Sequence, residues 1–177
     1  MLFQSPGCPL ELVVENKSGL LMLYNAATIQ SGAVESLQVG DQSDWQFNAI
    51  PAYDPITNMV YVADSSSTTD PNTSVSYSEG LIAFQVKSDC TLDPIPSWSA
   101  PNDPGRWVSM SPPTVANGVV YYGDGSGNKL FAYEAATGAP LWDSGSSILG
   151  GIWAAPLVVN GRLFVGSWDG HLYSFAP

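Results

Sequence analysis

The sequence has few of the residues that carry most catalytic and metal chemistry. It contains one histidine, His171, so a site built from several histidines cannot form within this chain. Its two cysteines, Cys8 and Cys90, lie far apart and form no Cys-x-x-Cys pair, which excludes a zinc knuckle. No Gly-x-Ser-x-Gly elbow supplies a serine nucleophile to pair with the histidine. The sequence contains no run of about 18 apolar residues, which is the length needed to cross a membrane.

Basic residues are also scarce, and this disfavours two classes of partner. The chain has 16 acidic and 5 basic residues, a net charge of −11. Such a field repels phosphate backbones and anionic membrane surfaces, so we expect no nucleic acid partner. The basic residues stand singly along the chain and form no patch: Lys17, Lys87, Arg106, Lys129 and Arg162.

Glycine, proline and aromatic residues are plentiful, and they indicate a folded chain of short elements. The 177 residues include 17 Gly and 14 Pro, which suit many turns and argue against an all-helical protein. The 6 Trp, 8 Tyr and 6 Phe supply enough buriable surface for a core and argue against disorder. We therefore predict an all-β fold with less than about one tenth helix.

An internal repeat dominates the second half of the chain. The segment 113–123 recurs at 156–166, with proline, an Asn-Gly pair and a final glycine at matching positions. Asn117-Gly118 and Asn160-Gly161 each separate two apolar runs, the strongest short-range signal for a β-hairpin. Four-stranded units repeating every 40–50 residues or so are typical of propeller blades.

Weaker copies upstream extend the repeat to about four units, approximately 10–40, 45–100, 106–145 and 150–177. The first unit lacks an obvious innermost strand, and the last stops before its outermost one. A polar insert at 64–80 is predicted to be a surface loop. The expected strands are 11–16, 20–25 and 33–39; 48–53, 59–63, 81–86 and 92–98; 112–116, 119–123, 129–134 and 139–143; and 154–159, 162–166 and 171–175.

The stretch 132–142 resembles the tryptophan-docking repeat of the quinoprotein-type β-propellers, in which pyrroloquinoline-quinone-like repeats read Ala-x-Asp-x-x-Thr-Gly-x-x-x-Trp. The resemblance covers 106–177 well and 10–100 weakly. It implies that Trp142 is structural and packs between neighbouring blades. Four positions match and Glu134 replaces the aspartate, so the docking residues expected here are Ala132, Glu134, Thr137, Gly138 and Trp142.

The family resemblance further implies an eight-bladed disc, of which four units make half. Such an arc exposes apolar blade faces at its two ends, which is an association hazard. We therefore expect either a piece of a longer protein or an arc that pairs through its open faces with a protein partner or another copy of itself.

Two functions follow from the resemblance. The first is a non-enzymatic, exported scaffold or binding module, with no catalytic residue and no cofactor. The alternative is a fragment of an alcohol or sugar dehydrogenase that uses pyrroloquinoline quinone and calcium. Adjacent cysteines of the kind often found over the quinone are absent, and the candidate ligands match no family motif: Asp44, Asn48, Asp103 and Asp124.

Three further features have more than one interpretation. The segment 124–128 carries oxygen ligands at alternate positions, as a short calcium loop does, but an ordinary glycine-rich hairpin turn is favoured. His171 is interpreted as a partly exposed strand residue. Blade packing is the main expectation for four tryptophans, and a stacking platform for a sugar or quinone the minor one: Trp45, Trp98, Trp107 and Trp153.

The two cysteines are relevant to the cellular compartment in which the protein works. Cys8 precedes the strand at 11–16, and Cys90 follows the strand at 81–86, so the two lie in neighbouring units. If the protein is exported, a disulfide between them is expected, and the alternative is two buried free thiols. The start of the sequence has no signal-peptide pattern, which does not argue against export if the N-terminus is truncated. The expected location is periplasmic or extracellular.

Overall fold

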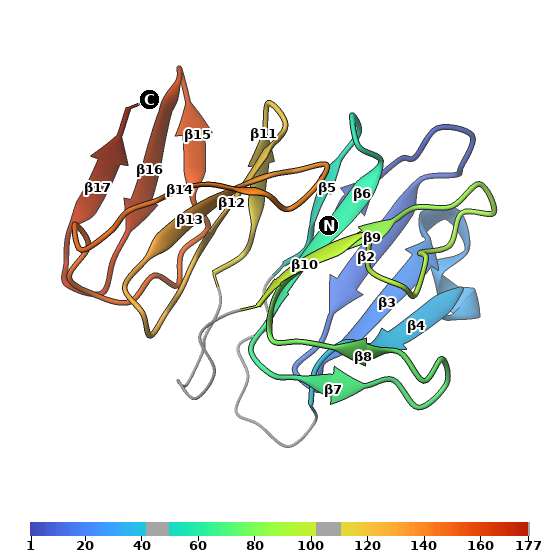
Figure 1. Ribbon diagram of the computed structural model, residues 1–177. Helices are drawn as coiled ribbons and strands as arrows, with labels where there is room; N and C mark the ends of the chain where they lie inside the picture. The colour runs from blue at the N-terminus through green and yellow to red at the C-terminus, as the bar shows by residue number, and fades with distance from the viewer. Residues whose placement is uncertain (42–49, 102–110, 177) are drawn as a thin grey trace.

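The computed structural model describes residues 1–41, 50–101 and 111–176, and it consists of antiparallel sheets in chain order (Figure 1). We call the four main sheets blades 1 to 4. Blade 1 contains β1 (Leu2–Phe3), β2 (Glu11–Glu15), β3 (Leu20–Asn25) and β4 (Glu35–Gln38). Blade 2 contains β5 (Ala52–Asp54), β6 (Met59–Asp64), β9 (Gly80–Gln85) and β10 (Trp98–Pro101). Blade 3 contains β11 (Thr114–Ala116), β12 (Val119–Gly123), β13 (Leu130–Glu134) and β14 (Pro140–Asp143). Blade 4 contains β15 (Leu157–Val159), β16 (Arg162–Gly166) and β17 (Leu172–Phe175).

The predicted all-β fold is confirmed. Within the described ranges the helical structure is η1 (Ala26–Ser31), a 3-10 segment of 6 residues. Each blade is a meander in which sequential strands pair, as the hairpin signals require. Asn117 and Gly118 have φ of 52° and 76°, and Asn160 and Gly161 have 49° and 73°. Positive φ at both central residues is the geometry of the type I′ turn that the Asn-Gly pairs predicted.

The innermost strand of blade 1 comes from the start of the chain, where we predicted none. β1 pairs with β2 through Leu2↔Leu12 and Phe3↔Glu11. Phe3 is buried, and its ring centroid lies 4.5 Å from that of Tyr53 in blade 2. A strand of 2 residues is too short to give an alternation pattern, so only this packing reveals it.

The second unit differs from the prediction in two places. The segment predicted as a strand at 92–98 consists mostly of bends and irregular backbone, with one bridge from Leu92 to Val86, and the strand β10 begins only at Trp98. The insert at 64–80 is more than a surface loop, because β7 (Thr68–Thr69) and β8 (Ser76–Tyr77) form a small hairpin there. Tyr77 is buried edge-on against Phe84 of β9, so this aromatic contact holds the insert on blade 2.

Three clusters of buried side chains hold the blades together, one at each junction. The cluster between blades 1 and 2 includes Val13, Leu21 and Leu23 facing Val60, Ile82 and Phe84. The cluster between blades 2 and 3 includes Tyr61, Ala83, Trp98, Val120, Tyr122 and Ala135. The cluster between blades 3 and 4 includes Leu130, Ile148, Ile152, Leu163 and Val165. The core therefore lies between sheets and not within one central body.

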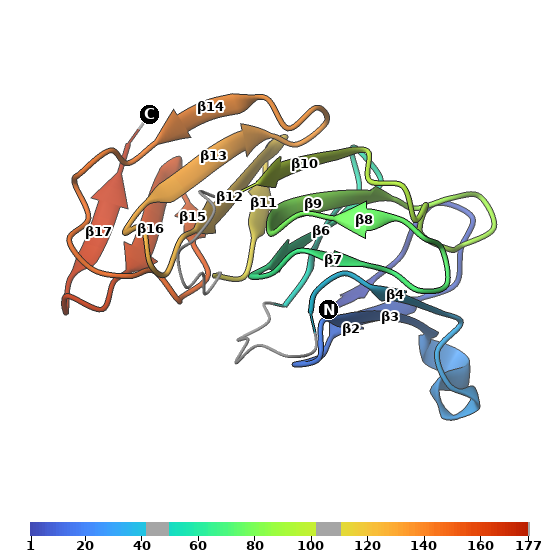
Figure 2. The ribbon, with the colours of Figure 1, turned by 60° about the horizontal axis from the view of Figure 1, so that its bottom comes forward.

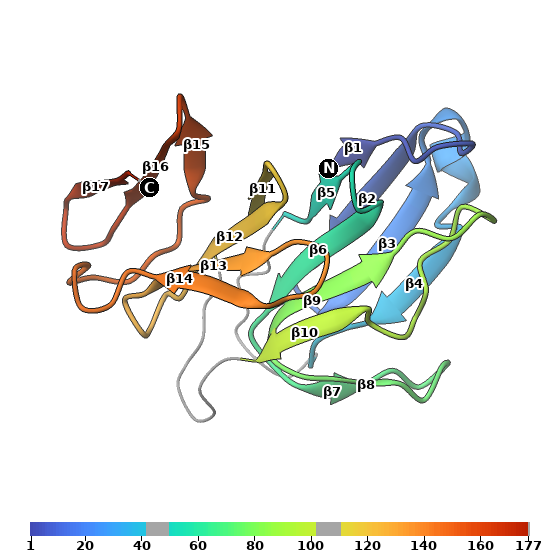
Figure 3. The ribbon, with the colours of Figure 1, turned by 45° about the horizontal axis from the view of Figure 1, so that its top comes forward.

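The blades stand face to face along an open arc, with blade 1 at one end and blade 4 at the other (Figures 2 and 3). The innermost strands of neighbouring blades are adjacent, since β11 contacts both β5 and β15. The sheets do not close into a ring. One face of blade 1 and one face of blade 4 therefore have no blade against them among the described residues.

A disulfide crosses the first junction. Cys8, in the turn between β1 and β2, is bonded to Cys90, in the turn after β9, and their Cα atoms are 5.6 Å apart. Cys90 has a positive φ of 66° at this turn. Of the two alternatives that the sequence left open, the structure has the bridge between neighbouring blades and not two free thiols.

Candidate functional site

The junction between blades 2 and 3 is built around Trp98. The indole is 9% exposed, and its Nε1–H donates a hydrogen bond of 2.8 Å to the carbonyl of Ala135. The hydroxyl of Tyr61 donates to the same carbonyl at 3.1 Å. Tyr61 and Tyr133 flank the indole, with ring centroids 5.7 and 6.4 Å away. This tryptophan therefore fastens the outermost strand of blade 2 to blade 3 through both apolar contact and hydrogen bonding.

The turn that receives Trp98 carries part of the docking motif. Gly138 has φ of 71°, and a Cβ placed on it would lie 2.6 Å from Cδ2 of the indole. Only glycine allows that approach without displacing the ring. The hydroxyl of Thr137 donates to the Glu134 carboxylate and thereby closes the turn. Ala132 is buried at the middle of β13.

Trp142, the motif's own tryptophan, has a different environment. It lies on β14 and is 40% exposed. Its main aromatic contact is Phe175 of β17, whose ring centroid is 5.0 Å away at a steep angle. The motif residues are therefore divided: Gly138 serves the junction with blade 2, and Trp142 faces blade 4.

The registers show that Trp98 is the counterpart of Trp142. Trp98 pairs with Ala83 across β9 and β10, as Trp142 pairs with Ala132 across β13 and β14. Sequence reasoning gave Trp98 only a general packing role. The signal that could have identified it is an alanine at the same position in the third strand of both units, Ala83 and Ala132. A longer connection between Gln85 and Trp98 obscured that signal, because it breaks the motif's spacing.

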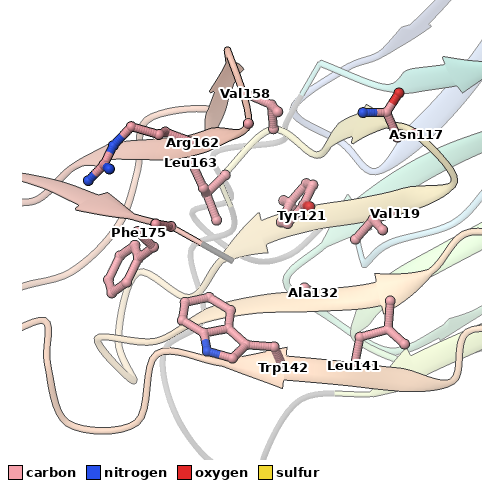
Figure 4. Close-up of a pocket in the computed structure, with 12 residues that line it drawn as sticks. Asn117, Val119, Tyr121, Ala132, Leu141, Trp142, Val158, Arg162, Leu163 and Phe175 are labelled. Carbon is pink, nitrogen blue, oxygen red and sulfur yellow. The ribbon is translucent and has the colours of Figure 1, made fainter.

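A groove runs beside Trp142, between blades 3 and 4 (Figure 4). Its volume is about 490 Å³, and its walls come from β12, β13 and β14 on one side and from β15, β16 and β17 on the other. The lining is mostly apolar and aromatic, and Arg162 is its charged member: Asn117, Val119, Tyr121, Ala132, Leu141, Trp142, Val158, Gly161, Arg162, Leu163, Phe175 and Ala176. This shape and chemistry are typical of a site that binds an apolar group.

The two end faces of the arc are apolar as well. On blade 1, Leu12 pairs with Tyr24 and Val14 with Met22, and all four are half-buried on the face turned away from blade 2. On blade 4, the outward face carries three leucine or valine side chains that are clearly exposed: Leu157, Val159 and Leu172. Faces of this kind cover one another at the three internal junctions, so those at the two ends can receive a further apolar surface.

Buried carboxyl groups gather at the junction between blades 1 and 2. Glu11 is 2% exposed, and burial together with the nearby Glu35 raises its pKa to about 7. Burial raises the pKa of Glu15 well above its usual value, and the neighbouring Asp64 carboxyl raises it further. Glu35 accepts a hydrogen bond from the N–H of Leu92, but burial still raises its pKa. In each case burial stabilises the protonated form relative to an exposed carboxyl group.

Of the four candidate metal and quinone ligands, the structure describes one, Asp124. Asp124 lies in the β12–β13 turn, where its carboxylate accepts from the N–H of Ser126 at 2.7 Å, as in an ordinary hairpin turn. Asp44, Asn48 and Asp103 lie outside the described residues. Across 1–41, 50–101 and 111–176, no group of three His, Cys, Asp or Glu side chains gathers in a way that could hold a metal ion.

A stacked aromatic pair marks the loops of blade 4. Trp153 and Trp168 lie with ring centroids 5.2 Å apart and planes 21° from parallel, and Trp168 is largely exposed. The other two tryptophans considered for stacking, Trp45 and Trp107, lie outside the described ranges. In the same turn, His171 is exposed beside Asp169, its Nδ1 3.2 Å from the carboxylate.

The hydroxyl of Tyr173 is the main hydrogen-bond donor to the Asp169 carboxylate. It donates at 2.6 Å, and the N–H of His171 donates to the other carboxylate oxygen at 3.0 Å. Together these donors lower the pKa of Asp169 to about 2. The arrangement closes the β16–β17 turn, and a hydrogen bond from the Ser167 side chain also contributes to the lowered pKa of Asp169.

Comparisons with known proteins bear on the fold. No family model matches the sequence, and no curated protein matches it. The computationally designed protein Ika4 aligns with a TM-score of 0.65 and 12% identity over 94% of this chain and 84% of Ika4. The β-propeller domain of Cps50 (Swd1) from Myceliophteria thermophila aligns with a TM-score of 0.62 and 10% identity over 94% of this chain. The fold is that of a β-propeller.

The chain spans about half the length of the natural propeller domain it aligns with, 50% of that of Swd1. It also aligns with BamB from Moraxella catarrhalis at a TM-score of 0.45 and 15% identity, covering 55% of that protein. At these identities the likeness concerns the arrangement of blades and does not extend to activity. In the described part of the chain, no helix has the length and apolar character needed to span a membrane.

Proposed function

We propose that this chain is a non-enzymatic scaffold or binding module of the quinoprotein-like repeat class, which uses its open blade faces to hold a protein partner or another copy of itself. The observation that carries the proposal is the pair of apolar end faces, on blades 1 and 4, which no further blade covers among the described residues. A second arc of the same kind would bring a blade 4 face against a blade 1 face at two places. That arrangement would complete an eight-bladed ring with twofold symmetry.

We also propose that the protein works outside the cytoplasm, in the periplasm or the extracellular space. The disulfide between Cys8 and Cys90 supports this, because such bonds persist in oxidising compartments. The net charge of −11 agrees with the absence of nucleic acid from the proposed partners.

Sedimentation analysis across a range of protein concentrations tests association through the end faces. Leu157 on the outward face of blade 4 is 57% exposed, so Leu157→Asp should weaken association without disturbing the core. Ile56 is 78% exposed in the β5–β6 turn, away from both end faces, and Ile56→Asp is the matched control. Equal behaviour of the two variants would refute this face as the contact.

Reconstitution separates the proposal from the dehydrogenase alternative. Pyrroloquinoline quinone and calcium are added to the purified chain, and binding and dye reduction are measured. We expect neither saturable quinone binding nor turnover. Saturable binding that depends on calcium, together with dye reduction in the presence of an alcohol or sugar, would overturn the non-enzymatic assignment.

A further inference from the structure

Among the described residues, blade 4 has an unpaired strand edge where each other blade has a fourth strand. Blades 1, 2 and 3 end with β4, β10 and β14, whereas the described part of blade 4 ends with β17. The repeat makes β17 the counterpart of β13, because Ala132 pairs with Tyr121 as Ser174 pairs with Phe164. An edge of this kind offers backbone N–H and C=O groups for another strand to pair with.

The backbone groups that point to this edge follow from blade 3. There, the carbonyl of Leu130 accepts from the N–H of Ser144 at 2.9 Å, and the N–H of Glu134 donates to the carbonyl of Ala139 at 2.8 Å. Bonds to one neighbour alternate along an antiparallel strand, so Ala132 also faces the fourth strand. Ser174, its counterpart in blade 4, therefore directs its N–H and C=O to the open side.

The groove lies along that same edge and continues the junction between blades 3 and 4. Phe175 and Leu163 form its blade 4 side, and Tyr121 and Trp142 form its blade 3 side (Figure 4). Leu163 belongs to the buried cluster of this junction, and both Tyr121 and Phe175 pack against that cluster. The groove is thus the outer continuation of an established interface, and a segment entering it would extend the same apolar contact.

The junction between blades 2 and 3 shows what kind of segment fits. Trp98, the counterpart of Trp142, is covered by residues 135–138, the turn before the fourth strand of blade 3. That segment contributes a carbonyl to the indole N–H and a glycine beneath the ring, and then continues as β14. A segment that covers Trp142 in the same manner needs a glycine turn followed by an extended, apolar strand.

Charge at the edge adds a preference for an acidic residue. Arg162 borders the groove, but its Nε donates to the Ser174 hydroxyl at 3.0 Å, so its guanidinium lies beside the β17 edge on the outward face of blade 4. An incoming strand passes beside this pair. A carboxylate on that strand can bind the guanidinium, which presents further N–H donors.

We propose that the β17 edge and the groove beside Trp142 form a strand-addition site for an extended segment of a partner protein, apolar in character, preceded by a glycine turn and carrying a carboxylate. Backbone pairing with Ser174 supplies affinity, and the groove selects side chains. This deepens the proposed binding-module function and rests on it, since it names the kind of partner that the module holds.

The probe is a capped synthetic peptide with this chain's own residues 135–143, Ala-Ala-Thr-Gly-Ala-Pro-Leu-Trp-Asp, titrated calorimetrically into the full chain. We expect binding of one peptide per chain. A peptide with the same side chains but N-methylated amides at alternate strand positions lacks the backbone donors, so its affinity should fall at least tenfold. Equal binding of the two peptides, or no binding of the unmodified one, would overturn strand addition.

Variants of the protein test where the peptide binds. Ser174→Pro removes the outward N–H at an edge that tolerates proline, and it should lower peptide affinity at least tenfold, whereas Ser174→Ala should retain most of it. Trp142→Ala should also weaken binding, because it removes one wall of the groove. Peptide binding unchanged in both Ser174→Pro and Trp142→Ala would refute this location.

The outcome is separable from that of the end-face proposal. Leu157 lies on the outward face of blade 4, and the groove lies on the opposite side, toward blade 3. If the peptide fails to bind while Leu157→Asp still disrupts association, the strand-addition proposal is wrong and the proposed binding through the end faces is retained. If the peptide binds to a chain that stays monomeric, the proposal of association between copies is wrong and the strand-addition proposal is retained.

Discussion

Replacement of Trp98 by alanine should destabilise the protein much more than replacement of Trp142. The indole of Trp98 is 9% exposed and fills the junction between blades 2 and 3. A buried tryptophan covers roughly 150–250 Å², and truncation of a core aromatic side chain to alanine costs about 3–5 kcal/mol. We expect Trp98→Ala to cost that amount, without a further penalty for Ala135, whose carbonyl keeps the hydrogen bond from Tyr61.

Trp142→Ala provides the comparison. This indole is 40% exposed beside a groove, so its removal enlarges an open space and leaves no sealed cavity. We expect a cost of about 1–2 kcal/mol, roughly half of that for Trp98 or less. Urea unfolding followed by far-ultraviolet circular dichroism measures both without depending on tryptophan fluorescence. Equal costs, or a larger one for Trp142, would refute the assignment of Trp98 as the docked residue.

The same contact can be tested from the glycine side. Gly138 and Gly161 have nearly the same φ, 71° and 73°, so alanine meets the same backbone strain at both. A Cβ at Gly138 would collide with the Trp98 ring, whereas nothing lies within 4 Å of one at Gly161. Gly161→Ala should cost about 1–2 kcal/mol, and Gly138→Ala clearly more. If the double variant Gly138→Ala, Trp98→Ala loses as much as the two single changes together, the two residues are not in contact.

Three further outcomes are expected. Replacing Cys8 and Cys90 by serine should lower the free energy of unfolding by roughly 4 kcal/mol in the chain-entropy model, measured by urea unfolding, and an unchanged midpoint would refute the bridge. Because the folded protein raises the Glu11 pKa from 4.5 to about 7, its stabilising effect is present at low pH and is lost as the pH rises through 7. Glu11→Gln should therefore match the parent near pH 4, below the unfolded pKa, and be more stable at pH 8, and the reverse order in thermal unfolding would contradict the burial argument. Denatured, unreduced protein should show no titratable thiol, because both cysteines are bonded.

The sequence by itself determined the blades. Asn117-Gly118 and Asn160-Gly161 specify hairpin turns through local backbone preference alone, and the alternating residues around them assign each strand a face. Local signals of this kind need no information about the rest of the chain, so they gave the order of strands in blades 3 and 4 and the all-β class. The disulfide between Cys8 and Cys90 could also be expected from the sequence, because it needs only that two consecutive blades lie side by side.

The tertiary structure decided which residues meet across the junctions. Trp98 and Trp142 occupy equivalent strand positions, but only the spacing around Trp142 matches the motif, and the more deeply buried indole is that of Trp98. Burial depends on what the next blade presents: a glycine turn at Gly138 in one case, and an open groove in the other. Likewise, β1 depends on a tertiary contact, because its Phe3 packs in the buried cluster between blades 1 and 2. Contacts between distant segments follow from packing, which no local pattern encodes.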